Sequence, residues 1–269
     1  MLERRINPVG RAATASVPRI SLGGLRLAVL DIEQTANFMI GMVFPERCVG
    51  RPLYLTSANG EVLARCSTEP MTERLFRSAD LINADGQPLV TVSKLKSKTP
   101  LPERVATTDL FHVVARKAEA ARLTFYMFGA DEEENALAVA NVRKMYPNLQ
   151  IVGHSHGYLK GDALRAKVDE INALAPDYLW VALGVPYEQA FVEEYTTRLS
   201  NVGVIKTSGG LFNFLSGSRP RAPRWMQQIG LEWFYRTIKE PKRMFKRYFV
   251  DDLAFFPLVV KYKFKAQRR

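Results

Sequence analysis

The sequence predicts an α/β protein with a Rossmann-like, mostly parallel sheet core and a C-terminal helical appendage. Between residues 20 and 207, short apolar stretches typical of strands alternate with stretches typical of single helices. This alternation indicates βαβ units with parallel strands. After residue 210 the alternation stops, and basic residues are mixed with aromatic ones. We therefore expect a disordered segment at 1–18, an α/β core at 19–205 and a helical appendage at 206–269.

The elements of the core follow from apolar runs of strand length and from apolar spacings of three and four residues, such as Leu110, Val113 and Val114. The expected strands are Leu25–Val29, Pro52–Ser57, Leu81–Ala84, Leu123–Phe128, Gln150–His154, Tyr178–Leu183 and Val202–Lys206. The expected helices are Ile32–Val43, Gly60–Glu69, Thr72–Ser78, Thr108–Ala121, Asp131–Met145, Asp162–Leu174 and Glu188–Leu199. In the appendage, Pro223 can start a helix that reaches Lys239.

The composition points to a reducing compartment. Two cysteines, Cys48 and Cys66, do not make a disulfide framework. No secretory signal is visible, and the longest apolar run, Leu253–Val260, is far below the roughly 20 residues that cross a bilayer. We expect a cytoplasmic protein.

The charge is segregated. Residues 201–269 hold 15 Lys/Arg and 4 Asp/Glu, a surplus that equals the net charge of +11 of the whole chain. Nine aromatic residues lie among these charges between Trp225 and Phe256. Basic and aromatic residues together suit an anionic membrane surface. They also suit nucleic acid, or a solvated basic helix with an aromatic core face.

Four expected strands end in turns that contain Gly, Asn or Asp, and these turns indicate a nucleotide site. Such turns let a backbone approach a phosphate near the start of a helix. They are Ser57-Ala58-Asn59-Gly60, Asn83-Ala84-Asp85-Gly86, Phe128-Gly129-Ala130-Asp131 and Leu183-Gly184-Val185-Pro186. Neither GxGxxG nor a Walker sequence is present, which disfavours a hydride-transfer dinucleotide enzyme and a P-loop NTPase.

Two polar motifs allow more than one interpretation. Asp85 at a strand end can take a proton from an attacking hydroxyl, or it can cap the next element in an Asx turn. His154-Ser155-His156 has a spacing found in metal sites, but no acidic or Cys ligand lies close in sequence. A polar-edge or packed role is favoured for these histidines over a metal site.

The C-terminal part of the chain resembles the WecB/TagA/CpsF family, glycosyltransferase family 26. The resemblance is carried by GGLFNFLSGSRPRAPRWMQQIGLEWFYRTIKEPKRMFKRY at Gly209–Tyr248. Upstream, NADGQPLV (Asn83–Val90), RVATTDLF (Arg104–Phe111) and ALGVPYEQAF (Ala182–Phe191) occur in the order of the family's motifs. The resemblance covers about residues 20 to 250.

The resemblance implies an enzyme that moves a sugar, of the N-acetylmannosamine or glucose class, from a UDP-sugar to an undecaprenyl-diphosphate-linked saccharide. It implies inversion at the anomeric carbon, no cofactor and no metal. Asp85 matches the family's proposed general base, and Arg104 matches the arginine of a second motif. The expected substrate-binding residues are Ser57, Asn59, Asn83, Gly129, Gly184, Pro186, Glu188, Gln189, Gly209, Gly210 and Asn213, together with Arg221, Arg236 and Arg243, which are expected to close over the diphosphate.

Several positions depart from the family pattern. The usual Pro-x-Gln-Glu is Pro186-Tyr187-Glu188-Gln189, with the last two side chains exchanged. The usual FDF has Asn213 in place of its carboxylate, the motif threonine is Ser57, and Thr107 stands where the family has glycine. The family glutamine is thought to face the donor sugar, so these departures leave the identity of that sugar open. They also allow a divergent member of the family with weakened or lost activity.

The physical chemistry agrees with a transferase. Sugar transfer places negative charge on the leaving diphosphate, and fixed arginines and helix N-termini can stabilise it without a metal. We expect a UDP-sugar, a polyprenyl-diphosphate-linked acceptor and an anionic membrane as partners, at the inner face of the plasma membrane. We expect no nucleic acid partner. The sequence does not decide whether the chain forms a homo-oligomer. The alternative is a non-catalytic basic α/β module that binds anionic lipid or nucleic acid.

Overall fold

The computed structural model describes residues 13–43 and 51–219, with single positions at 223, 226, 235 and 238. The strands are β1 (Arg19–Leu22), β2 (Leu25–Ala28), β3 (Leu53–Ala58), β4 (Leu81–Ala84), β5 (Thr124–Gly129), β6 (Gln150–Ser155), β7 (Tyr178–Ala182) and β8 (Val204–Thr207). The helices are α2 (Ile32–Gly41), α3 (Gly60–Thr68), α4 (Pro70–Arg77), α5 (Gln87–Lys96), α6 (Thr107–Ala121), α7 (Glu132–Met145), α8 (Gly161–Leu174), α9 (Tyr187–Tyr195) and α10 (Leu211–Leu215).

Six strands form one sheet in the order β4-β3-β8-β7-β5-β6, and every neighbouring pair is parallel. The last strand in the sequence, β8, lies in the interior of the sheet between β3 and β7. Parallel strands need crossover connections, which the intervening helices supply. The predicted α/β fold with a Rossmann-like parallel sheet is therefore confirmed.

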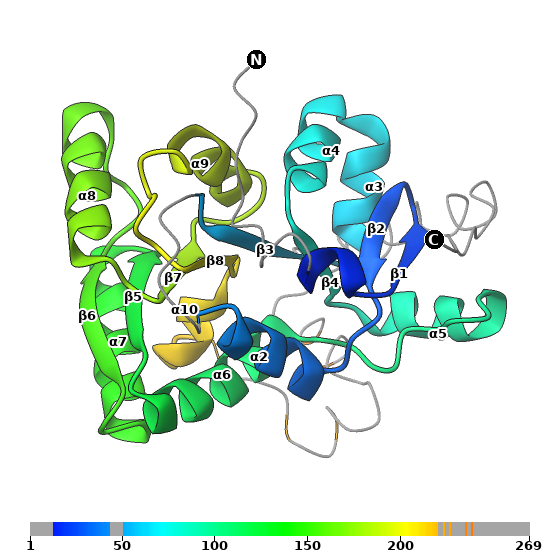
Figure 1. The fold of residues 1–269 in the computed structure, drawn as a ribbon, viewed down its shortest axis with the longest axis horizontal. Helices are drawn as coiled ribbons and strands as arrows, with labels where there is room; N and C mark the ends of the chain where they lie inside the picture. The colour runs from blue at the N-terminus through cyan, green and yellow to red at the C-terminus, as the bar shows by residue number, and fades with distance from the viewer. Residues whose placement is uncertain are drawn as a thin grey trace.

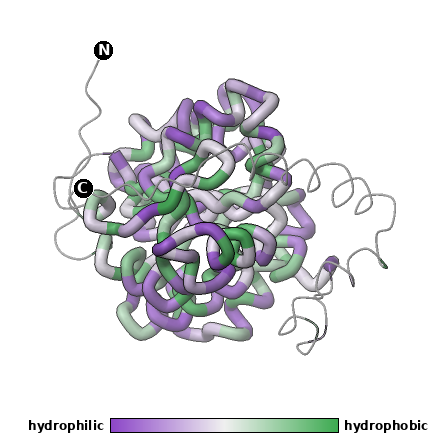
Figure 2. The backbone as a smooth tube through the Cα atoms, turned by 90° about the vertical axis from the view of Figure 1, so that its right-hand side faces the viewer, coloured by the Kyte–Doolittle hydropathy of each residue, from purple (hydrophilic) through white to green (hydrophobic). Residues whose placement is uncertain are grey.

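Helices cover both faces of the sheet (Figure 1). Buried residues of α2, α6, α7 and α10 form one core cluster with the sheet. Buried residues of α8 and α9 form a second cluster, which packs on the other face. Figure 2 shows hydrophobic stretches running through the middle of the molecule, with hydrophilic stretches around them. Because both faces are covered, the strands can be apolar throughout, as parallel strands usually are.

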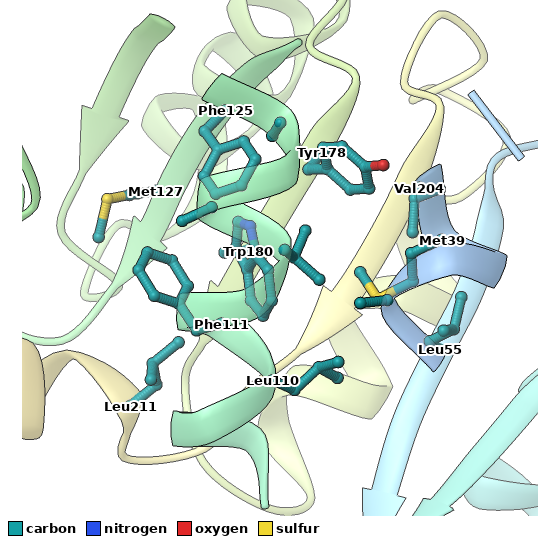
Figure 3. Close-up of a cluster of buried hydrophobic side chains, with 14 of the residues drawn as sticks. Met39, Leu55, Leu110, Phe111, Phe125, Met127, Tyr178, Trp180, Val204 and Leu211 are labelled. Atoms are coloured by element: carbon teal, nitrogen blue, oxygen red, sulfur yellow. The ribbon is translucent and has the colours of Figure 1, made fainter. Parts of the chain in front are cut away.

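Trp180 on β7 occupies the centre of the larger core cluster (Figure 3). Its ring lies 4.9 Å from the ring of Phe111 on α6 and 5.8 Å from that of Phe125 on β5, measured between centroids. All three side chains are fully buried. Edge-on and tilted contacts of this kind add to the free energy gained from burying the aromatic area.

The first expected strand, Leu25–Val29, is part of a hairpin and not of the parallel sheet. It corresponds to β2, which pairs antiparallel with β1. Gly23 and Gly24 make the turn between them, both with positive φ (+55° and +87°), a backbone that two-residue hairpin turns require. Neither β1 nor α5 was predicted from the sequence. Helix α5 packs against this hairpin in a third apolar cluster.

The buried residue Asp80 links the start of the sheet to the N-terminal segment. Asp80 pairs with Arg51, and its second oxygen accepts the Tyr54 N–H at 2.8 Å. The Asp80 carbonyl accepts from Arg19 at 2.8 Å, and the same guanidinium reaches the Thr14 carbonyl at 2.9 Å. Residues 13–16 form a helical turn. Within the segment expected to be disordered, 1–18, residues 13–18 are thus ordered, and residues 1–12 lie outside the described part of the chain.

The expected boundary between core and appendage, at 205/206, falls inside β8. Lys206 and Thr207 belong to the sheet, and α10 packs against α7. The sheet unit therefore extends through residue 215. The expected helix from Pro223 to Lys239 lies outside the described ranges, apart from four single positions. Among the helices of the described residues, none combines the length and the apolar character that a membrane crossing requires.

Replacing the central tryptophan tests the core. Trp180→Ala is expected to lower the free energy of unfolding by about 3–5 kcal/mol, because it leaves a cavity among Phe111 and Phe125. Denaturant unfolding followed by circular dichroism measures this. Leu95→Ala is the control, since Leu95 on α5 is 78% exposed and should change stability by less than about 0.5 kcal/mol. A loss below about 1 kcal/mol for Trp180→Ala would contradict the packing described.

Candidate active site

The polar turns expected to form a nucleotide site lie together at one edge of the sheet. They follow β3, β4, β5 and β7, whose strands are all parallel, so their carboxyl ends meet at the same edge. Ligands of open parallel α/β sheets bind beyond this edge. β8 also ends here and adds a fifth turn, Ser208-Gly209-Gly210, which the analysis of strand ends did not include.

Asp85 follows β4 directly and is half-buried. Its own N–H donates to the Ala58 carbonyl at 2.8 Å, which fixes it beside the end of β3. Its Oδ2 accepts from the Thr107 N–H at 3.2 Å and from the Thr107 hydroxyl at 3.1 Å. The carboxylate thus binds the first residue of α6, a favourable place for negative charge. The hypothesis that it caps the next element in a local Asx turn has no support in these contacts.

Ser57 connects Asp85 to a lysine that the sequence analysis did not single out. The Ser57 hydroxyl lies 3.2 Å from the Thr107 hydroxyl and accepts from Lys206 Nζ at 2.8 Å. Lys206 lies on β8 and is 0% exposed. Lys206, Ser57, Thr107 and Asp85 therefore form one chain of hydrogen bonds. The only local signal for this role is a single lysine within an apolar strand, Val204-Ile205-Lys206.

Lys206 and Glu188 are buried groups of opposite charge that stabilise each other. Burial lowers the pKa of Lys206 to about 8, while Glu188 and Asp85 act in the opposite direction. Burial raises the pKa of Glu188, and the Gly209 N–H and Lys206 oppose that shift. The Glu188 carboxylate accepts from the Gly209 N–H at 2.8 Å, so it also holds the turn that follows β8.

Glu188 and Gln189, the pair exchanged relative to the family pattern, are both buried. Gln189 Nε2 reaches the Glu188 carboxylate at 3.2 Å and the Thr56 hydroxyl at 3.3 Å. Both side chains therefore bind within the protein, under the turns of the carboxyl edge. The structure places Glu188 next to Gly209, and Gln189 toward the middle of the sheet.

The two candidate asparagines near Asp85 have separate positions. Asn59 is the N-cap of α3, where its Oδ1 accepts the Val62 N–H at 2.9 Å. Asn83 is fully buried, and its Nδ2 donates to the Thr35 hydroxyl at 3.3 Å. Asn59 therefore lies at the edge of the sheet with Asp85, whereas Asn83 packs behind the strand.

Arg104 approaches the site through the segment before α6. The Val105 N–H donates to the Ala84 carbonyl at 2.8 Å, which anchors this segment beside Asp85. The Arg104 guanidinium lies 3.8 Å from the Asp109 carboxylate, and the arginine side chain is about a quarter exposed, at 24%. This arginine therefore places a partly exposed cationic side chain near the Asp85 edge.

The candidate glycines differ in what surrounds them. Gly129 has φ of +136°, and a Cβ there would lie 2.3 Å from the Ala182 carbonyl oxygen, so it serves close backbone packing. Gly184 and Gly209 also have positive φ, but among the described residues a Cβ on either would meet no atom within 4 Å. The Gly184 turn continues into Pro186 through a cis peptide bond. Open space therefore lies at the turns after β7 and β8, not at Gly129.

Asn213, which replaces a family carboxylate, lies next to another carboxylate. Its side-chain amide donates to Glu134 at the start of α7. The Ser218 hydroxyl donates to the same carboxylate at 2.8 Å. Gly210 is close by, since a Cβ there would lie 3.3 Å from the Asn213 side-chain oxygen. A carboxylate is therefore retained at this place, from an element that the motif did not include.

His154 has the polar role at the sheet edge that the sequence analysis favoured. It lies on the edge strand β6, and its Nδ1 is 2.8 Å from the side-chain oxygen of the buried Asn135. Burial lowers the pKa of His154. Within the part of the chain that the structure describes, no three His, Cys, Asp or Glu side chains gather as a metal site would require. Arg221, Arg236 and Arg243 lie outside the described residues.

Comparisons with known proteins identify the family that the chain resembles. The family model described as "Glycosyl transferase WecG/TagA/CpsF family" matches residues 20–269. A protein of Bacillus spizizenii is 35% identical over 190 residues, which cover 71% of this chain and 72% of that protein. A protein of Bacillus subtilis is 35% identical over 169 residues (63% and 64%), and one of Staphylococcus aureus strain MW2 is 27% identical over 192 residues (71% and 74%). All three are named N-acetylglucosaminyldiphosphoundecaprenol N-acetyl-beta-D-mannosaminyltransferase.

The buried lysine predicts an unusual dependence of stability on pH. The pKa of Lys206 is about 8 in the folded protein and about 10.4 in an unfolded chain. Between these values the unfolded state holds a proton that the folded state has released, so the free energy of unfolding rises with pH. From pH 8 to pH 9.5 the expected gain is at most about 2 kcal/mol.

The reference for this measurement is the double variant Lys206→Met with Glu188→Gln, which lacks both buried charges. The free energies of unfolding of the two proteins are compared by denaturant titration at each pH. The difference between wild type and the double variant should grow in favour of the wild type as pH rises. A constant difference over this range would show that Lys206 does not titrate there.

Proposed function

The chain belongs to the glycosyl transferase WecG/TagA/CpsF family, and we propose that it transfers a sugar of the N-acetylmannosamine or glucose class from a UDP-sugar to an undecaprenyl-diphosphate-linked saccharide. Membership of this family makes it a glycosyltransferase. The acceptor is proposed because the relatives' name specifies an undecaprenol-diphosphate-linked N-acetylglucosamine. We assign the reaction to the synthesis of a cell-surface polysaccharide.

The observation that carries this proposal is the position of Asp85. It lies at the carboxyl edge of the sheet, and the hydrogen bonds that it accepts from described residues both reach Oδ2. Oδ1 is therefore the oxygen that can receive a proton. As the acceptor hydroxyl attacks the anomeric carbon, its proton passes to Asp85, and the bond to the diphosphate breaks with its electron pair leaving on UDP. Attack from the face opposite the diphosphate inverts the anomeric centre.

The negative charge that develops on the diphosphate needs fixed positive groups. Arg104 precedes the segment that is anchored beside Asp85, and its side chain is partly exposed. The N-terminus of α3 follows β3 at the same edge and adds the partial positive charge of a helix start. Arg221, Arg236 and Arg243, beyond the described residues, are proposed to close over the diphosphate. With these cations the transfer is proposed to need no metal.

The basic segment of the chain supports a membrane-bound site of action. Lys206 is buried and paired inside the sheet, so it does not belong to a basic surface. The other basic residues of the C-terminal quarter, mixed with aromatics, lie almost entirely beyond residue 219. We propose that they hold the enzyme at an anionic membrane surface, on the cytoplasmic side, where the head of a lipid-linked acceptor is exposed.

Removal of the proposed base tests the mechanism. Asp85→Asn should lower kcat by about 10²–10⁴, the usual effect of losing one acid–base group, while calorimetry still shows UDP-sugar binding. Transfer is measured on a polyprenyl-diphosphate-linked sugar. Asp162→Asn on α8 is the matched control, because that side chain is 96% exposed. Unchanged turnover of Asp85→Asn would rule out the assignment.

Vesicle sedimentation tests the membrane proposal. Full-length protein should pellet with anionic vesicles at low salt and much less with neutral vesicles or at about 1 M salt, where the Debye length is about 3 Å. Replacing Lys261, Lys263 and Lys265 together by Gln should weaken binding by roughly 1 kcal/mol for each lysine.

The control for vesicle binding carries the same charge change elsewhere. Lys94, Lys96 and Lys98 are exposed on or just after α5, and their joint replacement by Gln should leave vesicle binding unchanged. Equal loss of binding in the two triple variants would mean that only the total charge matters. That result would contradict a dedicated membrane-binding segment.

A further inference from the structure

We propose that Lys206 is a positioning residue for Asp85. Through Ser57 and Thr107, Lys206 fixes the direction of a buried chain of hydrogen bonds. This chain ends on Oδ2 of Asp85 and leaves Oδ1 of the same carboxylate to receive the proton of the acceptor hydroxyl. The inference rests on the proposed function, since it assumes that Asp85 takes the proton. Lys206 itself does not touch the reacting atoms. It acts from inside the sheet, on β8, which is separated from β4 by β3.

The number of hydrogens sets the direction of the chain. The Asp85 carboxylate only accepts, so the single hydroxyl hydrogen of Thr107 goes to Oδ2 at 3.1 Å. Thr107 must then accept from Ser57, whose hydroxyl lies 3.2 Å away. Ser57 in turn accepts from Lys206 Nζ at 2.8 Å. An ammonium group can only donate hydrogen bonds. Each hydroxyl in the chain therefore accepts from the lysine side and donates toward the carboxylate of Asp85.

A purely structural role for Lys206, as the counter-charge of Glu188, does not explain its contacts. The hydrogen bonds of Nζ go to Ser57 and to the Thr207 carbonyl at 2.9 Å. The Glu188 carboxylate accepts instead from the Gly209 N–H and from Gln189. Glu188 thus supplies attraction that keeps Lys206 charged in a buried place, while the donor of Lys206 is directed to the chain that leads to Asp85.

The positioning depends on the charge of the lysine. A neutral amine has a lone pair and can accept the Ser57 hydrogen, which removes the donor to Thr107 and breaks the direction of the chain. The charged groups that act on Lys206 are Glu188 from α9 and Asp85 after β4. Its register partners in the neighbouring strands, Leu55 and Trp180, carry no ionisable group. Because the pKa of Lys206 is lowered to about 8, transfer should weaken as pH rises past that value.

Kinetics of the full-length enzyme test the role. Wild-type kcat should fall on the alkaline side with an apparent pKa near 8, the value for Lys206. Lys206→Met with Glu188→Gln removes the donor without leaving a buried carboxylate unpaired. This double variant should lose roughly 10–100-fold in kcat, as outer-shell partners do, keep the KM for the UDP-sugar, and lack the alkaline fall. Lys144→Met, at an exposed lysine of α7, is the control.

A folded double variant, judged by circular dichroism, with wild-type kcat and the same alkaline fall would overturn the proposal. If the double variant does not fold, Ser57→Ala breaks the chain at its second link and retains both buried charges. It should reduce the alkaline fall in the same way. An unaltered pH profile in Ser57→Ala would equally overturn it.

A second measurement does not depend on transfer. Nuclear magnetic resonance of the lysine Nζ groups follows the titration of Lys206, which is assigned from its loss in the double variant. Because Asp85 raises the pKa of Lys206, Asp85→Asn should move the midpoint to lower pH, whereas Asp162→Asn should not. An unmoved midpoint in Asp85→Asn would overturn the link. Absence of sugar transfer by the wild type would contradict the proposed function. The shift of the Lys206 titration midpoint in Asp85→Asn would still show whether Lys206 and Asp85 are linked.

Discussion

The pairing of β3 with β8 is the constraint on which the site depends. Hydrogen bonds of this parallel pair bring Ser57 and Lys206 together although 149 residues separate them in the chain. Because β8 enters the interior of the sheet, the turn after it joins the edge that carries Asp85 and Asn59. The same insertion places the side chain of Lys206 where water cannot solvate it. Burial on this scale is tolerated only because Glu188, Ser57 and a backbone carbonyl compensate for the lost hydration.

Three residues that depart from the family pattern, Ser57, Thr107 and Asn213, make hydrogen bonds between different elements of the fold. Ser57 and Thr107 each differ from the family pattern, and their hydroxyl groups lie 3.2 Å apart. With a glycine at 107 there would be no side-chain hydroxyl to link Ser57 with Asp85. Asn213 lacks the usual carboxylate, yet Glu134 presents one to it from α7. Ser57, Thr107 and Asn213 thus each contact a residue on another element.

Local pattern was enough to predict most of the sheet and the edge at which the site lies. The strand bounds agreed to within one or two residues because apolar runs bounded by Gly, Asn and Asp are encoded locally. The hairpin of β1 and β2 was missed, although Gly23-Gly24 was a usable signal for its turn. Lys206 and Glu134 were missed for a different reason: their partners are distant in the sequence, and a lysine in a strand is usually exposed. Only the register between β3 and β8 reveals that Lys206 is buried.

The end of β8 also decides how the remainder of the chain is attached. Thr207 leaves the sheet at the carboxyl edge, and the Gly209 N–H and Ser218 hydroxyl still bind residues of that edge, Glu188 and Glu134. The residues after β8 therefore leave the sheet at its carboxyl edge, the edge on which Asp85 lies, and not at the opposite end of the strands. If the residues after 219 bind a membrane surface, as we propose, their point of attachment turns this edge of the sheet toward that surface, which makes orientation a property of chain topology.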